Sequence, residues 1–202
     1  MSSSHLDEAM VVRFAPTVVV GPSGVGKGTI VSRLASRYPC VWVSVSATTR
    51  PPRPREIDGV SYHFVSDAQF DTLIAEDGLL EWATVHGSAR YGTPLAPVAQ
   101  KIDEGRAVVL ELDYQGARQT MARLAQARSV FIAPPSWEEL ERRLRGRGTE
   151  SAEVIARRLE TARLEMETIE EWSTVIVNRE VEEALAELVE FIGLRPATSH
   201  SE

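Results

Sequence analysis

Residues 17–29 read TVVVGPSGVGKGT, and this stretch decides the fold. The run at 17–20 predicts a short buried strand that ends abruptly at Gly21. The turn that follows satisfies the pattern G-x-x-x-x-G-K, and a helical pattern with an apolar side continues from Lys27 to Arg37. A strand, a glycine-rich loop, a lysine and a helix in this order predict a loop that binds the phosphates of a nucleotide.

The chemistry of such a loop explains its residues. Glycines let backbone N–H groups curl around phosphate oxygens, the helix N-terminus adds its positive end, and Lys27 reaches the outer phosphates. The alternative is a glycine-rich turn with a solvent-facing lysine. Gly28 stands where the general pattern has a hydroxyl for Mg²⁺, and Thr29 comes one residue late. This G-K-G-T form resembles nucleoside-monophosphate kinases, which implies Mg²⁺ held mainly through ATP phosphates and water, with no protein ligand.

Apolar runs at regular intervals extend this unit into a larger fold. Strands are expected at 41–45, 107–112, 129–133 and 174–177, and helices near 95–104, 115–126 and 136–145. Strands separated by helices predict a parallel sheet covered on both faces. The sequence therefore predicts a three-layer α/β core of the P-loop type.

Two stretches fit this alternation poorly. Residues 47–94 are rich in Pro, Gly, Thr and Tyr and predict an insertion with its own small mixed sheet and a short helix near 67–77. Residues 138–165 are dense in arginine and glutamate and predict a helical, solvent-exposed lid. One domain is expected over 14–195, between flexible tails at 1–13 and 196–202. A core with two insertions suits an enzyme that closes over two substrates.

Composition narrows the class of protein. A chain of 202 residues with 29 acidic and 22 basic side chains has a net charge of −7, which argues against a nucleic-acid partner. The single cysteine, Cys40, cannot form an intramolecular disulfide, so we expect a cytoplasmic protein. No apolar run approaches the roughly 20 residues that span a bilayer, so no membrane partner is expected.

A second phosphate site is indicated by residues 44–54, SVSATTRPPRP. Arg50 and Arg53 lie three residues apart, and the prolines stiffen the backbone, so the two side chains form a cationic fork for a phosphate dianion. The alternative is a proline-rich loop with solvated arginines.

The same stretch resembles the S-V-S-x-T-T-R-x-P-R segment of guanylate kinases. The resemblance spans about residues 17–192 and continues in the family's order through DGVSYHF (58–64), LEWA (80–83), YGT (91–93), ELDYQG (111–116), APPS (133–136), RGRGTE (145–150) and VIVN (175–178). It implies transfer of the γ-phosphate of MgATP to GMP, and also to dGMP, in purine nucleotide metabolism.

Site residues follow from the resemblance, position by position. It implies that Arg50, Arg53, Tyr62 and Tyr91 hold the GMP phosphate, and that Ser46, Glu81, Thr93 and Asp113 face the guanine. The residues that it places against ATP are Gly21, Pro22, Ser23, Gly24, Val25, Gly26, Lys27, Gly28, Thr29 and Asn178. Guanine presents N1–H and an exocyclic amine as adjacent donors, so a carboxylate such as Glu81 matches it, whereas adenine N1 would repel the same group.

This chain departs from the family in three places. Arg55 stands where glycine is common, Glu111 stands where aspartate is frequent, and the stretch before Tyr91 is longer by one residue.

The arginines of the 138–165 segment divide into two groups. Arg142, Arg143, Arg145 and Arg157 each follow a glutamate by four residues, the spacing of exposed helical ion pairs. Arg147 and Arg158 have no such glutamate upstream, and with Arg143 they match the family's lid arginines. We therefore expect Lys27, Arg147, Arg158 and Arg143 to be the catalytic cations, because phosphoryl transfer depends on neutralising charge on the moving group.

Two other functions remain open at this point. A catalytically inactive module that binds phosphorylated partner proteins would tolerate loss of Lys27 and the lid arginines, which are present here. A kinase for another phosphorylated acceptor, such as a ribose phosphate, would leave Glu81 and Asp113 without a base to bind.

Overall fold

The computed structural model describes residues 14–85, 89–146 and 152–195. A five-stranded sheet forms the centre of this part of the chain, in the order β2-β7-β1-β8-β9. Its strands are β1 (Thr17–Val20), β2 (Val41–Val43), β7 (Ala107–Glu111), β8 (Arg128–Ala133) and β9 (Thr174–Val177). All neighbouring pairs are parallel, so the predicted parallel sheet is confirmed.

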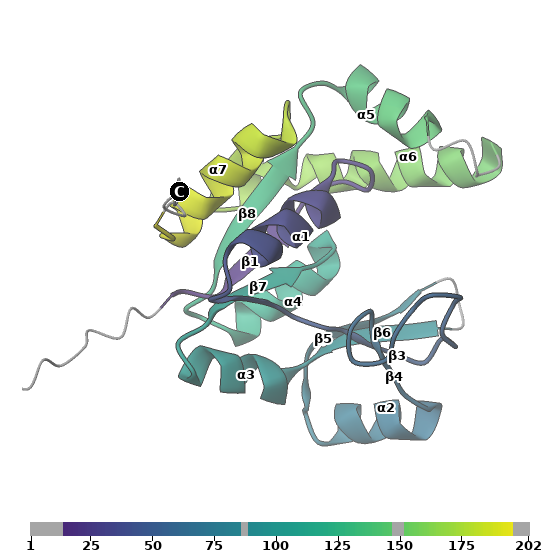
Figure 1. The fold of residues 1–202 in the computed structure, drawn as a ribbon. Helices are drawn as coiled ribbons and strands as arrows, with labels where there is room; N and C mark the ends of the chain where they lie inside the picture. Colours follow the sequence, from purple (N-terminus) through teal and green to yellow (C-terminus); the bar gives the residue numbers. More distant parts are fainter. Residues whose placement is uncertain (1–13, 86–88, 147–151, 196–202) are drawn as a thin grey trace, which may run out of the picture.

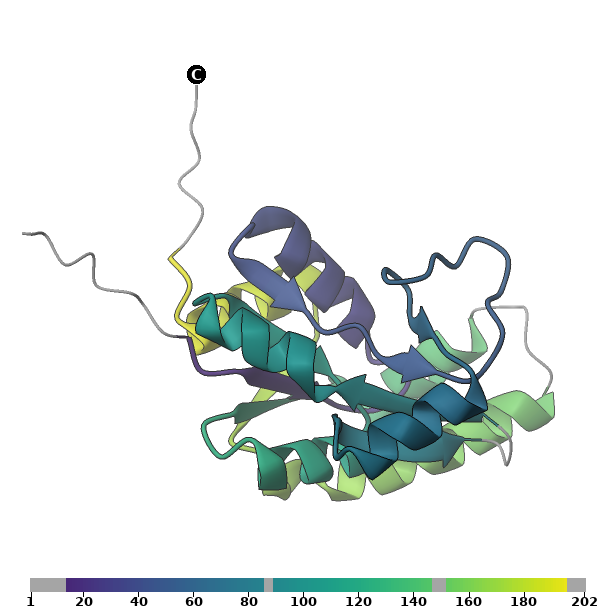
Figure 2. The same ribbon diagram turned by 90° about the horizontal axis from the view of Figure 1, so that it is seen from below.

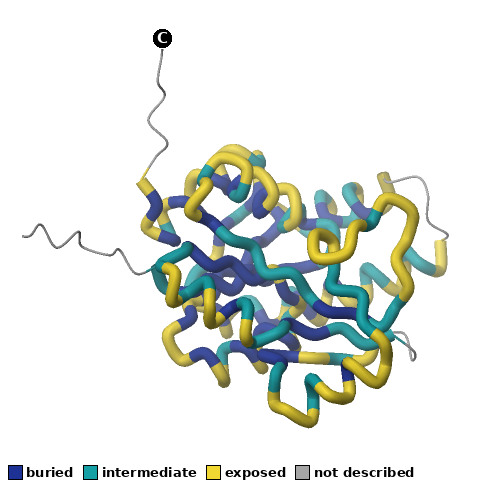
Figure 3. The backbone as a smooth tube through the Cα atoms, turned by 60° about the horizontal axis from the view of Figure 1, so that its bottom comes forward, coloured by how far each residue is buried: buried dark blue, intermediate teal, exposed yellow. Residues whose placement is uncertain are grey.

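Helices cover both faces of this sheet, which gives the three layers expected from the sequence (Figure 1). Successive valines of β1 point to opposite faces: Val19 packs in the cluster that contains α1 (Lys27–Arg37) and α7 (Val181–Ile192), whereas Val18 and Val20 pack in the cluster beside α3 (Leu95–Asp103) and α4 (Tyr114–Arg123). Strands buried on both faces consist of near-continuous apolar residues, and this is why TVVV is a reliable strand signal. Figure 3 shows the buried chain concentrated in this central layer.

A second sheet lies beside the first and is built from residues 47–94. Its order is β4-β3-β6-β5, with β3 (Ala47–Thr48) parallel to β4 (His63–Phe64) and antiparallel to β6 (Ala89–Pro94). The remaining strand, β5 (Leu79–Val85), pairs antiparallel with β6, and α2 (Asp67–Ala75) packs through buried Phe70. Ser66 begins α2 with a capping box, as its hydroxyl accepts from the Gln69 N–H. Figure 2 shows this sheet on one side of the central layer.

The arginine-rich segment consists of two helices, α5 (Trp137–Arg145) and α6 (Ala152–Glu167), followed by the 3-10 turn η1 (Ile169–Glu171). Leu140 and Leu144 of α5 and Ala162 of α6 are fully buried in the core cluster of α1 and α7. Arg142 and Arg145 of α5 point to solvent, away from these leucines.

Candidate active site

The phosphate-binding loop runs from the end of β1 into α1. Gly21 has a φ of 139°, and a Cβ atom at this position would lie 2.2 Å from the Ile132 carbonyl oxygen. No side chain fits in that space, so the first glycine of the pattern is required by the close approach of β8. The predicted strand, loop and helix therefore occur in the expected order and register.

Lys27 projects from the first turn of α1 back along the loop. Its Nζ donates to the carbonyl oxygens of Gly21 (2.5 Å) and Pro22 (3.3 Å). Burial lowers the pKa of Lys27, and the nearby carboxylates of Glu165 and Glu111 act in the opposite direction. The ammonium group is thus held at the loop between acidic side chains, which is the position from which it can meet a polyphosphate.

Two side chains of α6 meet the loop at a single residue, Ser23. The Ser23 N–H donates to Glu165 Oε2 (3.0 Å), and Arg158 Nη2 donates to Ser23 Oγ (2.9 Å). Glu165 is only 5% exposed, and burial raises its pKa against the opposing effects of the Ser23 N–H and Lys27. Since Arg158 and Glu165 are seven residues apart, two helical turns bring them to the same face of α6. Arg158, predicted as catalytic, therefore lies at the phosphate loop.

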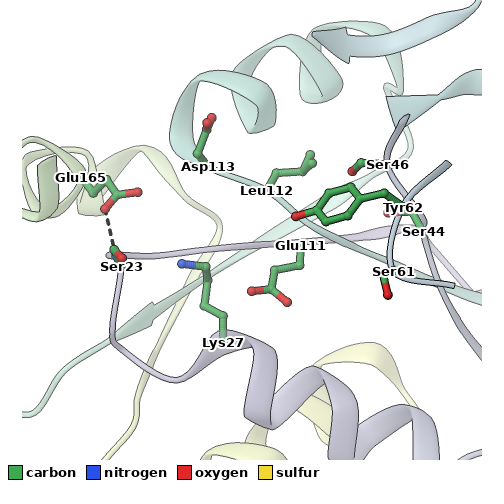
Figure 4. A pocket seen from close by; sticks show the side chains of 10 residues that line it. All are labelled: Ser23, Lys27, Ser44, Ser46, Ser61, Tyr62, Glu111, Leu112, Asp113 and Glu165. Atoms are coloured by element: carbon green, nitrogen blue, oxygen red, sulfur yellow. Dashed lines mark hydrogen bonds between the residues drawn. The ribbon is translucent and has the colours of Figure 1, made fainter. Parts of the chain in front are cut away.

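Two cavities, each of about 400 Å³, meet at the loop. One follows the loop itself and is lined by Pro22, Ser23, Gly24, Gly26, Lys27, Gly28, Thr29 and Glu111. The other extends toward the second sheet and is lined by Ser23, Lys27, Ser44, Ser46, Ser61, Tyr62, Glu111, Leu112, Asp113 and Glu165 (Figure 4). Ser23, Lys27 and Glu111 line both cavities, so a group held in one cavity can meet a group held in the other at these residues.

Asn178, directly after β9, lies against the phosphate loop, and its Nδ2 is 2.7 Å from the position that a Cβ on Gly26 would take. Asn178 is 2% exposed, and its Nδ2 donates to the Val25 carbonyl (2.7 Å), while its Oδ1 has no hydrogen-bond partner among the described residues. A buried acceptor without a donor costs about 1–3 kcal/mol. An adenine amine would supply such a donor, which supports the predicted role of Asn178 in binding ATP.

Arg143 has a different set of contacts from Arg158. Its guanidinium donates to Glu139 Oε1 (2.7 Å), to the Val25 carbonyl (3.3 Å) and to the Asn178 carbonyl (3.2 Å). These bonds fasten α5 to the phosphate loop and to the end of β9. Its predicted catalytic role stays a prediction.

The predicted acceptor-phosphate residues converge on Arg50. Arg50 Nε donates to Tyr91 Oη (3.0 Å), and the guanidinium carbon lies 5.3 Å from the centre of the Tyr62 ring. The Tyr62 and Tyr91 rings meet edge to face at 5.8 Å. Three of the four predicted residues therefore form one cluster, despite the longer stretch before Tyr91. The side chain of the fourth, Arg53, is exposed at the rim.

Glu56 is a member of this cluster that the sequence analysis missed. It accepts from Arg50 Nη1 (2.8 Å) and Nη2 (2.9 Å) and from the Arg53 N–H (2.7 Å), and these bonds lower its pKa to about 2. Arg50 also donates from Nε to Tyr91 Oη and from Nη1 to the Pro51 carbonyl. Four of its five N–H groups therefore donate hydrogen bonds within the chain. An acid directly after three closely spaced arginines was the signal available in the sequence.

The predicted base-binding residues lie where β5, β6 and α4 meet. Glu81 and Thr93 are directly opposite on β5 and β6, and Thr93 Oγ1 donates to Glu81 Oε1 (2.7 Å). Glu81 is 8% exposed, and burial raises its pKa, with the Thr93 hydroxyl acting in the opposite direction. Asp113 begins α4 by accepting from the Gly116 N–H (2.8 Å), and it lines the cavity together with Ser46.

The expected ion pairs of the arginine-rich helices are present in part. Arg143 pairs with Glu139 and Arg145 with Glu141, as predicted. The prediction that Arg142 pairs with Glu138 is wrong, because Arg142 turns to Glu139 instead (2.7 Å). Glu138 bonds near the helix start with Ser136, which places its carboxylate away from Arg142. Arg147, predicted as catalytic, lies outside the described residues.

Comparison with known proteins agrees with this geometry. The guanylate kinase family model matches residues 13–194. The chain belongs to the guanylate kinase family. It is 58% identical to a guanylate kinase of Thermobifida fusca over 176 residues, which is 87% of this chain and 89% of the relative. It is 54% identical to one of Cutibacterium acnes, over 88% of this chain and 89% of the relative.

A solved structure of the guanylate kinase family has the same fold. The crystal structure of guanylate kinase from Anaplasma phagocytophilum superposes with a TM-score of 0.70 at 32% identity, over 89% of this chain and 84% of that one. Arg55, where the resemblance implied a glycine, has a φ of 76°. An arginine here adopts the left-handed conformation that glycine favours.

The described residues contain neither a metal-binding cluster nor a membrane-spanning helix. They contain no group of three or more His, Cys, Asp or Glu side chains arranged to hold a metal ion. None of their helices has the length and apolar character needed to cross a membrane.

Proposed function

We propose that this chain transfers the γ-phosphate of MgATP to GMP, giving ADP and GDP, and that dGMP is accepted as well. The observation that carries the proposal is the pair of cavities that share Ser23, Lys27 and Glu111. One follows the loop, and the other reaches Tyr62, whose ring contacts Arg50, so two phosphorylated substrates can meet end to end at Lys27. A GMP phosphate oxygen then attacks the γ-phosphorus in line, and the bond to the bridging oxygen of ADP breaks.

In this proposal the residues of the phosphate loop bind ATP, the phosphate donor. Backbone N–H groups of 24–28 bind phosphate oxygens, Lys27 neutralises charge that develops on the transferred group, and Arg158 approaches the same group from α6. Arg147 completes the cation set as a prediction. Each cation acts more strongly because closure of the segments 47–94 and 138–165 excludes water.

The acceptor is recognised at both of its ends. Arg50, Arg53, Tyr62 and Tyr91 bind its phosphate, and the Glu81 carboxylate accepts from guanine N1–H and the exocyclic amine. Glu81 is buried, and its Oε1 already accepts from Thr93 Oγ1, so Oε2 is the oxygen left to accept from a base. Ser46 and Asp113 line the cavity, and Thr93 contributes by holding Glu81.

Magnesium fits the loop cavity through one carboxylate of the chain. Both Glu111 oxygens lie 3.6 Å from the position that a Cβ on Gly28 would take. Glu111 thus faces the place where the general loop pattern puts a hydroxyl ligand, and it is the residue that would hold the waters of Mg²⁺. The ion would supply positive charge that offsets the charge of the ATP phosphates.

The test is release of ADP with a panel of nucleoside monophosphates and ribose 5-phosphate as acceptors. We expect turnover with GMP and dGMP, and kcat/KM at least about a hundredfold lower with AMP, since a mismatched buried polar group costs that much. Turnover of ribose 5-phosphate at the rate of GMP, or no turnover of any acceptor, would refute the proposal.

A further inference from the structure

Gly116 lies in the first turn of α4 and is in close contact with Glu81. A Cβ built on Gly116 would lie 2.9 Å from Glu81 Oε2, 3.2 Å from its Cδ and 3.3 Å from its Cγ. The first of these distances is shorter than van der Waals contact allows. The absence of a side chain at position 116 is therefore what allows the Glu81 carboxylate to lie against the helix.

We propose that Gly116 is a specificity-determining residue, because it forms the surface against which Glu81 is oriented to bind guanine. The inference rests on the proposed function, since it takes Glu81 as the group that binds the base. The two Glu81 oxygens are then fixed from opposite sides. Thr93 donates to Oε1 at 2.7 Å, and Gly116 limits the position of Oε2.

Backbone conformation gives no reason for glycine here. Gly116 is within a regular helix and is absent from the positions with positive φ. Alanine is the better helix former by a wide margin, so helix stability alone favours the substitution. Contact with Glu81 is the feature of this position that a methyl group would disturb.

Contacts between α4 and the chain around β5 oppose movement of the helix away from Glu81. Gln119 of α4 accepts from the Trp82 N–H (3.2 Å) and donates to the Trp82 carbonyl (3.3 Å), which fastens α4 to β5 next to Glu81. At the end of α4, Arg123 pairs with Asp77. A methyl group at 116 would therefore displace the Glu81 side chain rather than the helix.

The test compares Gly116→Ala, Glu81→Gln and the double variant by steady-state kinetics and thermal unfolding. We expect Gly116→Ala to raise KM for GMP at least about tenfold, the scale of one lost charge-assisted hydrogen bond. KM for ATP should not change. The Tm should stay level or rise by up to about 4 °C, because alanine favours the helix. Ala122→Gly, an exposed change on α4, is the matched control and should lower Tm while leaving KM for GMP unchanged.

The double variant shows whether Gly116 acts through Glu81. Once Glu81→Gln has weakened GMP binding, adding Gly116→Ala should have little further effect, since contacting residues are not additive. Full additivity would overturn the inference. If Gly116→Ala fails to fold, Glu81→Asp, with a shorter side chain, should restore folding, and failure of that rescue would also overturn it.

Failure of this inference can be distinguished from failure of the proposed function. If Glu81→Gln impairs use of GMP and Gly116→Ala does not, Gly116 has no such role and the proposed function stands. If Gly116→Ala impairs use of GMP and Glu81→Gln does not, the route through Glu81 is wrong. If neither variant changes GMP kinetics, both the role of Gly116 and the assignment of Glu81 as the group that binds guanine are refuted.

Discussion

Substitution of Glu165 separates two effects of its carboxylate at the phosphate loop: the hydrogen bond that it accepts and the negative charge that it carries. Its side chain is buried, and Oε2 accepts from the Ser23 N–H at 3.0 Å. Glu165→Ala leaves that N–H without its acceptor, which should lower the unfolding free energy by about 1–3 kcal/mol. Glu165→Gln keeps an acceptor oxygen and removes only the charge, so its loss should be below about 1 kcal/mol.

The effect of charge has a defined sign. Burial raises the pKa of Glu165, so the carboxylate destabilises the folded chain increasingly as pH rises above its unfolded pKa of 4.5. Stability of wild type relative to Glu165→Gln should therefore decrease from pH 4.5 toward neutral pH. ATP binding should depend on the Glu165 oxygen that accepts from the Ser23 N–H. Glu165→Ala should therefore weaken ATP binding about fivefold or more, the equivalent of about 1 kcal/mol.

Urea unfolding at several pH values and calorimetric titration with ATP measure both quantities. Glu160→Gln, an exposed change on the same helix, is the control and should affect neither. Equal losses in Glu165→Ala and Glu165→Gln would show that the charge, and not the bond to Ser23, is what matters. Unchanged stability and ATP binding in both would refute the reasoning altogether.

Four further outcomes are expected. Lys27→Ala should lower kcat at least about a hundredfold with GMP still bound, as measured by ADP release and GMP titration. Arg158→Ala should lower kcat far more than Tm, whereas Arg145→Ala loses an exposed pair of about 0.3–0.5 kcal/mol and should be near neutral in the same assays. Arg55→Gly should raise the unfolding free energy by about 1 kcal/mol, because glycine adopts the left-handed conformation without strain. Hydrogen bonds lower the pKa of Glu56 from 4.5 to about 2, so the stability difference between wild type and Glu56→Gln should be lost as pH falls across that interval, as followed by acid unfolding.

Local signals in the sequence were sufficient for the core of the fold. The strand at 17–20 and the loop up to Lys27 could be predicted because the apolar run, the glycines and the helix all agree with one arrangement. The order β2-β7-β1-β8-β9 could not, because strand order depends on which helices pack on which face, and no local pattern records it. The strand predicted at 41–45 was also too long, since the pairing of β2 stops at Val43.

The sequence singled out the cations of the candidate site more readily than the acids that contact them. Arg50 and Arg158 were identified from the motif, and the structure places each in a cluster. Glu56 and Glu165 were missed because glutamates in charged loops and helices are normally exposed ion-pair members. Glu165 is buried against a segment distant in sequence, since 142 residues separate it from Ser23. Glu56 contacts residues only three and six positions away, but its pairing with Arg50 depends on how the loop between them folds.

The engagement of Arg50 by Glu56 has a consequence for how an acceptor phosphate arrives. Arg50 already has an internal counterion, so a phosphate that takes its N–H groups exchanges one anion for another and does not neutralise a bare cation. Such an exchange releases few ions from solution, and the affinity for the acceptor should then depend weakly on ionic strength. Arg53, whose side chain is exposed, would supply most of the salt dependence that remains. The same competition would favour a phosphate dianion over chloride or a carboxylate. Only an anion that binds Arg50 more tightly than the Glu56 carboxylate does can displace Glu56.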